Sequence, residues 1–278
     1  MTDSTPRLAP VICISHGGGP MPVLGDPGHT AIVKSLKTRV PKILKLNTPE
    51  QPRAIVLVTA HWQTADVTIS SGEKHPLYYD YGGFPKEAYS LKYDAPGSPE
   101  VAEEVRKALE KEGVRSVADG KRGWDHGVFV PMMLIHPAAN IPIVQVSVLS
   151  SESPSAHFAY GRALSSLRAQ NIAIVGSGFA SFHNLGLMFS GAARSPDFKR
   201  LNEAWNDAVK DAASTQDETQ RKEKFEKWRT WPSAYKMHPN GGAEHFLPLV
   251  VCAGAGRGAA KSYSDEFMGL KMWSFYWE

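Results

Sequence analysis

Four histidines stand beside apolar runs, at positions typical of side chains that are presented to one crevice. His16 follows "PVICIS", His61 follows "AIVLVTA", and His183 follows "IAIVGS" after a short loop. His245 opens an apolar run after the turn "GGAE". A single histidine at a strand end is more often structural. Neutral imidazole is nevertheless a good ligand for iron, zinc and copper, and several such histidines together favour a metal site.

The stretch "RGWDHGVFVPMM" contains a fifth histidine of interest, His126, next to Asp125. Two interpretations are open: a plain surface turn, or a histidine on a loop over the cleft that can move a proton. The remaining histidines lack such context and are expected to be structural or solvent-facing: His29, His75, His136, His157 and His238.

Other catalytic motifs fit the sequence poorly. The turn "HGGGP" lacks the lysine and the serine or threonine of a P-loop, so its glycines are expected to let the backbone turn closely around His16. The stretch "VGSGF" has Val175 and Phe179 where a nucleophile elbow needs glycines. No H-E-x-x-H helix of a zinc protease occurs.

Apolar runs rich in valine and isoleucine predict the elements that position these side chains. The three runs quoted above and "IPIVQVSVL" are typical of central strands that are covered on both faces. Between them, a helix is expected over 98–113, with Ser98 as its N-cap and Gly113 at its end, and another over about 155–170. The alternation predicts an α/β fold, with a central mixed β-sheet covered by helices and the metal site at the carboxyl ends of the strands.

The last third of the chain predicts further covering elements. Residues 196–229 are charged and helical in pattern, with Trp205, Phe225 and Trp228 as the buried stripe. The terminal "LKMWSFYWE" alternates weakly and is expected to form a final strand. No repeat or linker divides the chain, so residues 1–278 are predicted to form a single catalytic domain.

Composition limits the partners and the compartment. A net charge of +3, without clusters of basic and aromatic residues, argues against nucleic-acid binding. Cys13 and Cys252 are too few for a disulfide framework or a cysteine zinc site. No signal peptide or membrane-spanning run is apparent, so a cytoplasmic protein without membrane contact is expected, and its oligomeric state stays open.

Six motifs occur in the order found in one enzyme family: "SHGGGP", "TAHWQT", "DYGGFPKEAYSLKYDAPGSP", "GWDHGVFVPMM", "GSGFASFHNL" and "AEHFLPL". Over roughly residues 10–255 the chain resembles the class III extradiol ring-cleavage dioxygenases, in particular the 4,5-DOPA dioxygenase-like group. The resemblance implies iron(II) in the active form, while isolated protein can carry zinc. It places His16, His61 and His245 on metal positions, His183 as a further ligand or a proton-transfer residue, and His126 on the acid–base position.

The resemblance also has departures and open choices. Many members have a serine in the first motif, where this chain has Gly18 followed by Gly19. Distant members use two histidines and a glutamate, so Glu244 competes with His245 for the third ligand position. The implied reaction consumes a catechol and O2, and the sequence does not identify which catechol, nor where its ring is cut.

Aromatic residues close in sequence to the histidines are expected to wall a flat substrate: Trp62, Phe84, Trp124, Phe129 and Phe182. The tyrosine-rich segment "YYDYGGFPKEAY" is expected to be a lid that hinges at Gly82 and Gly83. Two other hypotheses remain at this point: a zinc-dependent hydrolase on the same metal site, and a non-catalytic relative of the fold.

Overall fold

Four parallel strands form the centre of the sheet, where the apolar runs predict them. The structure, a computed structural model, describes residues 7–278. Nearly all the side chains of these strands are buried, because helices cover both faces of the sheet. The four strands are β1 (Val11–Ser15), β2 (Ala54–Thr64), β5 (Ile143–Leu149) and β6 (Ile172–Gly178).

Four further strands extend the sheet on both sides in the order β4-β3-β5-β2-β6-β1-β8-β7. Strand β3 runs antiparallel to β5, and β8 runs antiparallel to both β1 and β7, so the sheet is mixed as predicted. The predicted C-terminal strand is therefore confirmed as β8. The added strands are β3 (Val67–Ser70), β4 (Ser116–Asp119), β7 (Lys261–Phe267) and β8 (Leu270–Trp277).

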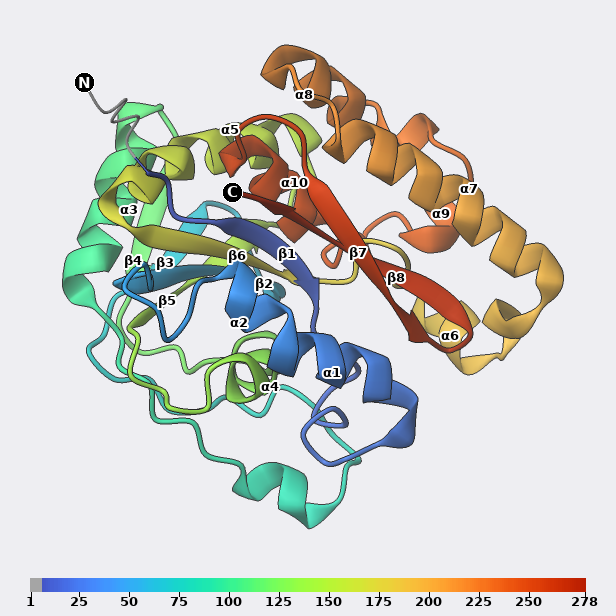
Figure 1. Ribbon diagram of the computed structural model, residues 1–278, viewed down its shortest axis with the longest axis horizontal. Coiled ribbons are helices and arrows are strands. Elements are labelled where there is room, and N and C mark those ends of the chain that lie inside the picture. Colours follow the sequence, from blue (N-terminus) through green and yellow to red (C-terminus); the bar gives the residue numbers. More distant parts are fainter. Residues whose placement is uncertain (1–6) are drawn as a thin grey trace.

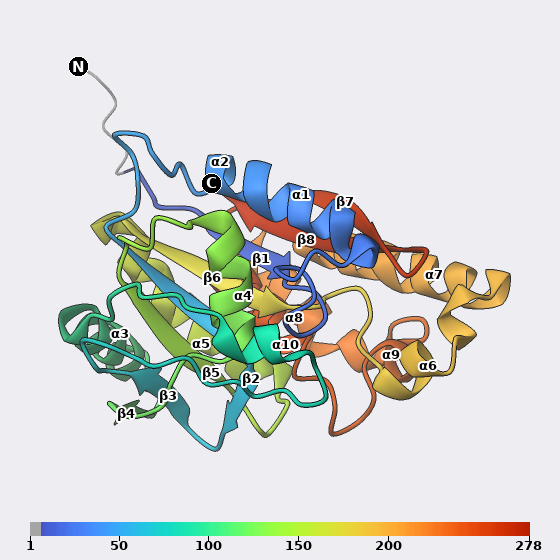
Figure 2. The same ribbon diagram turned by 90° about the horizontal axis from the view of Figure 1, so that it is seen from below.

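Helices form a layer on each side of the sheet (Figure 1). One layer contains α3 (Pro99–Lys111), α5 (Pro154–Leu164) and α10 (Leu247–Ala255). The other contains α1 (Thr30–Thr38), α2 (Val40–Ile43) and α4 (His126–Ile135), and the view from below in Figure 2 places α4 in front of the strands. The predicted helix over 98–113 is confirmed, with Ser98 Oγ accepting a hydrogen bond from Val101 N.

The remaining helices gather mostly at one end of the molecule (Figure 2). They are α6 (Leu185–Phe189), α7 (Pro196–Ala213), α8 (Glu218–Glu226) and α9 (Ala234–Met237). The predicted stripe is confirmed, since Trp205, Phe225 and Trp228 are fully buried. Short 3-10 helices complete the chain: η1 (Pro27–His29), η2 (Lys86–Ser90), η3 (Ser165–Gln170), η4 (Ala192–Arg194) and η5 (Trp228–Thr230). Among residues 7–278, no helix combines the length and apolar character needed to cross a membrane.

Strand β2 contains an irregularity that the apolar pattern does not reveal. Thr59 pairs with Ser147 of β5, but the next paired residue is Gln63, opposite Val148. The three residues between them bulge out of register, and pairing with β6 also ends at Thr59. The expectation that His61 follows the strand is therefore wrong. It lies in a bulge inside a longer strand, and bulges commonly redirect a side chain next to an active site.

Candidate metal centre

Five histidines and one glutamate line a single cavity of about 550 Å³ at the carboxyl ends of the central strands. Each comes from a different segment, except for one adjacent pair. His16 directly follows β1, His61 lies in the β2 bulge, His126 is the first residue of α4, His183 follows β6, and Glu244 and His245 precede α10. The structure thus brings together all five histidines that the sequence singled out.

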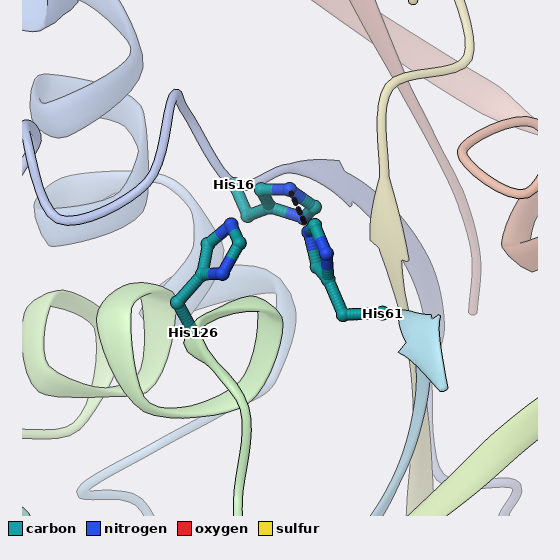
Figure 3. A group of neighbouring side chains, drawn as sticks. All are labelled: His16, His61 and His126. Atoms are coloured by element: carbon teal, nitrogen blue, oxygen red, sulfur yellow. Dashed lines mark hydrogen bonds between the residues drawn. The ribbon is translucent and has the colours of Figure 1, made fainter. Parts of the chain in front are cut away.

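His16, His61 and His126 form one group of possible metal ligands (Figure 3), and His183, Glu244 and His245 form a second. Within each group, the possible ligand atoms all lie within 4.8 Å of one another. The Nε2 atoms of His16 and His61 are 3.2 Å apart, the contact drawn as a dashed line in Figure 3. Two nitrogens that bind one metal ion at about 2.0–2.1 Å are separated by roughly 3.0–3.4 Å. This spacing therefore fits a shared metal ion.

Hydrogen bonds behind the rings support the same conclusion. The Ser177 hydroxyl donates to the Gly127 carbonyl, so it accepts from His16 Nδ1 at 3.0 Å and leaves a lone pair on His16 Nε2. His61 Nδ1 faces Asp80 Oδ2 at 3.5 Å, which favours a proton on Nδ1 and a lone pair on its Nε2 as well. Two lone pairs that face each other repel, and a cation between them removes the repulsion. Carboxylate and hydroxyl partners of this kind commonly orient metal-binding histidines.

His126 is fixed by Asp80. Asp80 Oδ1 accepts hydrogen bonds from His126 Nδ1 at 2.8 Å and from its backbone N–H at 2.9 Å. Burial raises the pKa of Asp80, but the hydrogen bonds and charge of His126 outweigh it, so the net pKa is lowered. The imidazole therefore holds its Nδ1 proton against a carboxylate and keeps Nε2 as the free nitrogen.

Glu244 lies against His245 and His183, the other two of the five histidines. Its Oε1 lies 2.7 Å from His245 Nδ1 and 3.4 Å from His183 Nδ1, and the two rings stack with their centroids 3.3 Å apart. Burial raises the pKa of Glu244, but the hydrogen bond and charge of His183 lower it by more. The net pKa is therefore below its ordinary value, and the carboxylate stays ionised. Glu244 and His245 thus both reach the cavity, and the carboxylate is bonded to the imidazole beside it.

Burial keeps three of the imidazoles uncharged. The pKa values of His16 and His245 lie well below the ordinary value, first because of burial and then because of neighbouring histidines. Burial, followed by the charge of His126, lowers the pKa of His61 to about 3. A neutral imidazole offers its lone pair without first losing a proton, so these three rings are prepared to bind a metal ion at neutral pH.

Asp125 supports the site from beneath and does not form a surface turn. It is fully buried, accepts a hydrogen bond from Thr59 Oγ1 at 2.7 Å, and lies 3.2 Å from Arg122 Nη2. Thr59 Oγ1 in turn accepts from the backbone N–H of His61 at 3.2 Å. Burial, and next the charge of Asp80, raise the pKa of Asp125 to about 6. Asp125 thereby links the start of α4 to the β2 bulge.

The aromatic wall differs from the one predicted. Phe84 lines the cavity, but the other four predicted residues are not among its lining. Trp124, Phe129 and Phe182 are fully buried in the core, and Trp62 packs against the Arg122 guanidinium at 4.8 Å. Neighbouring residues of a strand point to opposite faces, which places Trp62 away from the site that His61 faces. The wall is completed by Tyr81, Phe179 and Phe267.

Two side chains that contact the site histidines were not predicted from the sequence. Asp80 and Ser177 carry no catalytic signature of their own, although both lie in or next to quoted motifs, "DYGGFP" and "GSGFASFHNL". His29, expected to be merely structural or solvent-facing, also lines the cavity, where its Nε2 accepts a hydrogen bond from Gly18 N at 2.9 Å. It orders the glycine turn that follows His16.

Comparisons with known proteins identify the family of the chain. Residues 10–273 match the family described as the catalytic LigB subunit of aromatic ring-opening dioxygenase. A protein named Dioxygenase tasH from Hapsidospora irregularis is 52% identical, over 97% of this chain and 86% of its own length. The 4,5-DOPA dioxygenase extradiol of Beta vulgaris is 33% identical, over 87% of this chain and 85% of its own.

A solved structure has the same fold. A crystal structure of an uncharacterized protein from Escherichia coli K12 superimposes with a TM-score of 0.75 at 29% identity, covering 98% of this chain and all of the other. The family match covers nearly the whole chain, and two relatives above 30% identity carry dioxygenase names. The chain therefore belongs to the LigB family of class III extradiol ring-cleavage dioxygenases and is an oxidoreductase that opens aromatic rings.

Proposed function

We propose that this chain is an iron(II)-dependent extradiol dioxygenase that opens a catechol ring with O2 to give a ring-opened semialdehyde acid. The observation that carries the proposal is the convergence of five histidines and Glu244 on one cavity. Both oxygen atoms of O2 enter the product, so the reaction needs no external reductant.

His16, His61 and His245 are the proposed metal ligands, with His183 as a further ligand or a proton-transfer residue. Burial lowers the pKa of all three imidazoles, which suits neutral nitrogen ligands. Glu244 is bonded to His245 Nδ1 at 2.7 Å and is proposed to orient that ring rather than to bind the ion itself. When bound, iron(II) supplies the electron-transfer chemistry that O2 needs to react with an aromatic ring.

His126 is the proposed acid–base residue. Asp80 holds its Nδ1 proton at 2.8 Å, so Nε2 is the atom that accepts the proton of a catechol hydroxyl and later returns it. The negative charge of Asp80 stabilises the imidazolium that forms in between. The His126 ring lies 3.8 Å from the His61 ring and 5.6 Å from the His16 ring, measured between centroids, so the proton acceptor adjoins the proposed ligands.

Aromatic side chains exclude water from the reacting ring. Phe179 packs edge-on against His16 with 5.3 Å between centroids, and Tyr81 packs in the same way against His126 at 5.7 Å. These rings form an apolar slot next to the histidines that suits a flat aromatic substrate. Relatives carry the name 4,5-DOPA dioxygenase extradiol, so DOPA is the first catechol to test.

Oxygen uptake by protein reconstituted anaerobically with iron(II) tests the proposal. Addition of DOPA or another catechol is expected to consume oxygen in step with formation of a yellow ring-opened product. Zinc-loaded protein is the matched control and is expected to consume none, because zinc has no redox chemistry. Tight binding of iron without oxygen uptake for any catechol would contradict the proposed function.

A further inference from the structure

The outer half of the cavity is apolar. Beyond the histidines, its lining includes Leu185, Met188 and Phe189 of helix α6, and Phe267 and Met268 at the turn between β7 and β8. A catechol ring bound at the histidines occupies only the inner part of a cavity of about 550 Å³. The outer part is therefore available to a substituent on the ring.

Helix α6 presents its apolar face to this outer part. Residues at i, i+3 and i+4 lie on one side of a helix, which places Leu185, Met188 and Phe189 together. Phe189 is 85% exposed and Leu185 is 52% exposed, among the largest exposures of large apolar side chains in residues 7–278. Contiguous exposed apolar residues commonly mark a binding surface. Asn184 caps α6 by accepting from Leu187 N, and so attaches this face next to His183.

The charges at the cavity do not suit a carboxylate on the substrate. Among the described residues that line it, the ionisable groups are histidines, Tyr81 and Glu244, with no lysine or arginine. Arg122, Lys86 and Lys236 are not among the lining residues. Arg122 is paired with Asp125 beneath the site, and Lys86 and Lys236 are exposed outside the cavity.

Two further cations also lie outside the cavity. Arg194 and Lys199 line a separate surface hollow that shares only Met268 with the cavity. Both are exposed to solvent, where attraction to a carboxylate is weak. A carboxylate close to the ring would therefore meet Glu244 and apolar side chains, and it would lose hydration without gaining a partner.

We propose that the substrate is a catechol with an uncharged, apolar substituent, and that the apolar face of α6 together with Phe267 and Met268 binds this substituent. The inference rests on the proposed function and narrows it to a substrate class. Phe189 is the specificity-determining residue that it names, because its exposed ring has the most apolar surface left to cover.

A panel of catechols on the iron-loaded enzyme tests this inference. With catechol, 4-methylcatechol and 4-butylcatechol, kcat/KM from oxygen uptake is expected to rise roughly threefold for each methylene that is buried. The carboxylate of similar length, 3-(3,4-dihydroxyphenyl)propionate, and DOPA are expected to react more slowly than 4-butylcatechol. Faster turnover of either carboxylate would overturn the inference while leaving the proposed function intact.

Two variants test whether the α6 face acts on the substituent or whether its loss affects the turnover of every catechol. Phe189→Ala is expected to lower kcat/KM for 4-butylcatechol roughly tenfold more than kcat/KM for catechol. Val117→Ala on the distant strand β4, where Val117 is 52% exposed, is the matched control and should change neither value. Equal losses for both substrates in Phe189→Ala would count against α6 as the binding face.

Calorimetric binding to zinc-loaded protein measures the preference without turnover. Here 4-butylcatechol is expected to bind more tightly than the propionate, and Phe189→Ala should remove most of the difference. If no catechol supports oxygen uptake, the proposed function fails, and this binding order still decides the substituent preference. A tighter propionate would overturn the inference by itself.

Discussion

Asp80 binds His126 twice through one oxygen. Asp80 Oδ1 accepts from both the backbone N–H and Nδ1 of His126, at 2.9 and 2.8 Å. The two hydrogen bonds fix the position of the main chain at the start of α4 and the orientation of the ring together. The loop that contains Asp80 therefore positions the proposed acid–base residue.

Asp80→Asn is expected to lower kcat/KM roughly 10–100-fold while iron binding is retained. The amide keeps the shape of the side chain but removes the negative charge that stabilises a protonated His126. The measurement is oxygen uptake at matched iron content, with the pH profile of kcat recorded as well. Wild-type turnover with an unchanged profile would show that Asp80 has only a structural role.

Removal of the imidazole of His245 should abolish stoichiometric iron binding, whereas Glu244→Gln and His126→Ala should retain it. The expected difference follows from His245 as a ligand, Glu244 as its hydrogen-bonding partner at 2.7 Å, and His126 as the proton acceptor. Iron content after anaerobic gel filtration gives the result directly. Retained iron in His245→Ala, with loss in Glu244→Gln, would assign the carboxylate as the ligand instead.

Metal-free protein is expected to lose stability as the pH falls from about 6.5 toward 4, in part because of His157. Burial lowers the pKa of this histidine to about 4, and its Nε2 accepts from Leu149 N at 2.9 Å. Between these pH values the unfolded chain takes up a proton that the folded chain does not, so the free energy of unfolding decreases by up to about 1.4 kcal/mol per pH unit. Urea unfolding across this range should show a shallower dependence in His157→Gln, and an identical slope would contradict the assignment.

Gly127→Ala should weaken both folding and metal binding. An added methyl group would lie 2.7 Å from Thr59 Oγ1 and 2.9 Å from His61 Cδ2, so the β2 bulge must shift. A loss of about 1–3 kcal/mol in the free energy of unfolding is expected, together with weaker iron binding. Gly186→Ala is the control, because its methyl group approaches only Asn184 Oδ1, at 3.5 Å. Unchanged iron affinity in Gly127→Ala would show that His61 tolerates the shift.

Gly82→Ala tests whether the segment that carries Tyr81 and Phe84 acts as a lid. Space around Gly82 is open, so the methyl group costs the folded state little. A stiffer backbone is then expected to slow turnover without lowering the melting temperature, as measured by oxygen uptake and thermal unfolding. Equal loss of activity and stability would argue against a lid.

The sequence predicted the parallel strands and the convergent histidines because both depend on local patterns. Apolar runs identify buried strands, and the carboxyl ends of parallel strands meet at one edge of the sheet. The bulge at His61 was not predictable, since Ala60 and Trp62 continue the apolar run and register depends on the partner strand. The prediction that Trp62 lines the substrate site was wrong for the same reason. Asp80 reaches His126, and Phe267 reaches the cavity, from segments whose position is set by tertiary packing.

The bulge also divides β2 into two parts of unequal rigidity. Up to Thr59 the strand is paired on both sides, whereas Gln63 and Thr64 pair with β5 alone and the His61 amide bonds to Thr59 Oγ1 instead of a neighbouring strand. Segments with fewer main-chain partners open more readily than the core beside them. Slow amide exchange should therefore stop abruptly at residue 59, and the ring of His61 can adjust to an incoming ion while the sheet beneath it stays folded.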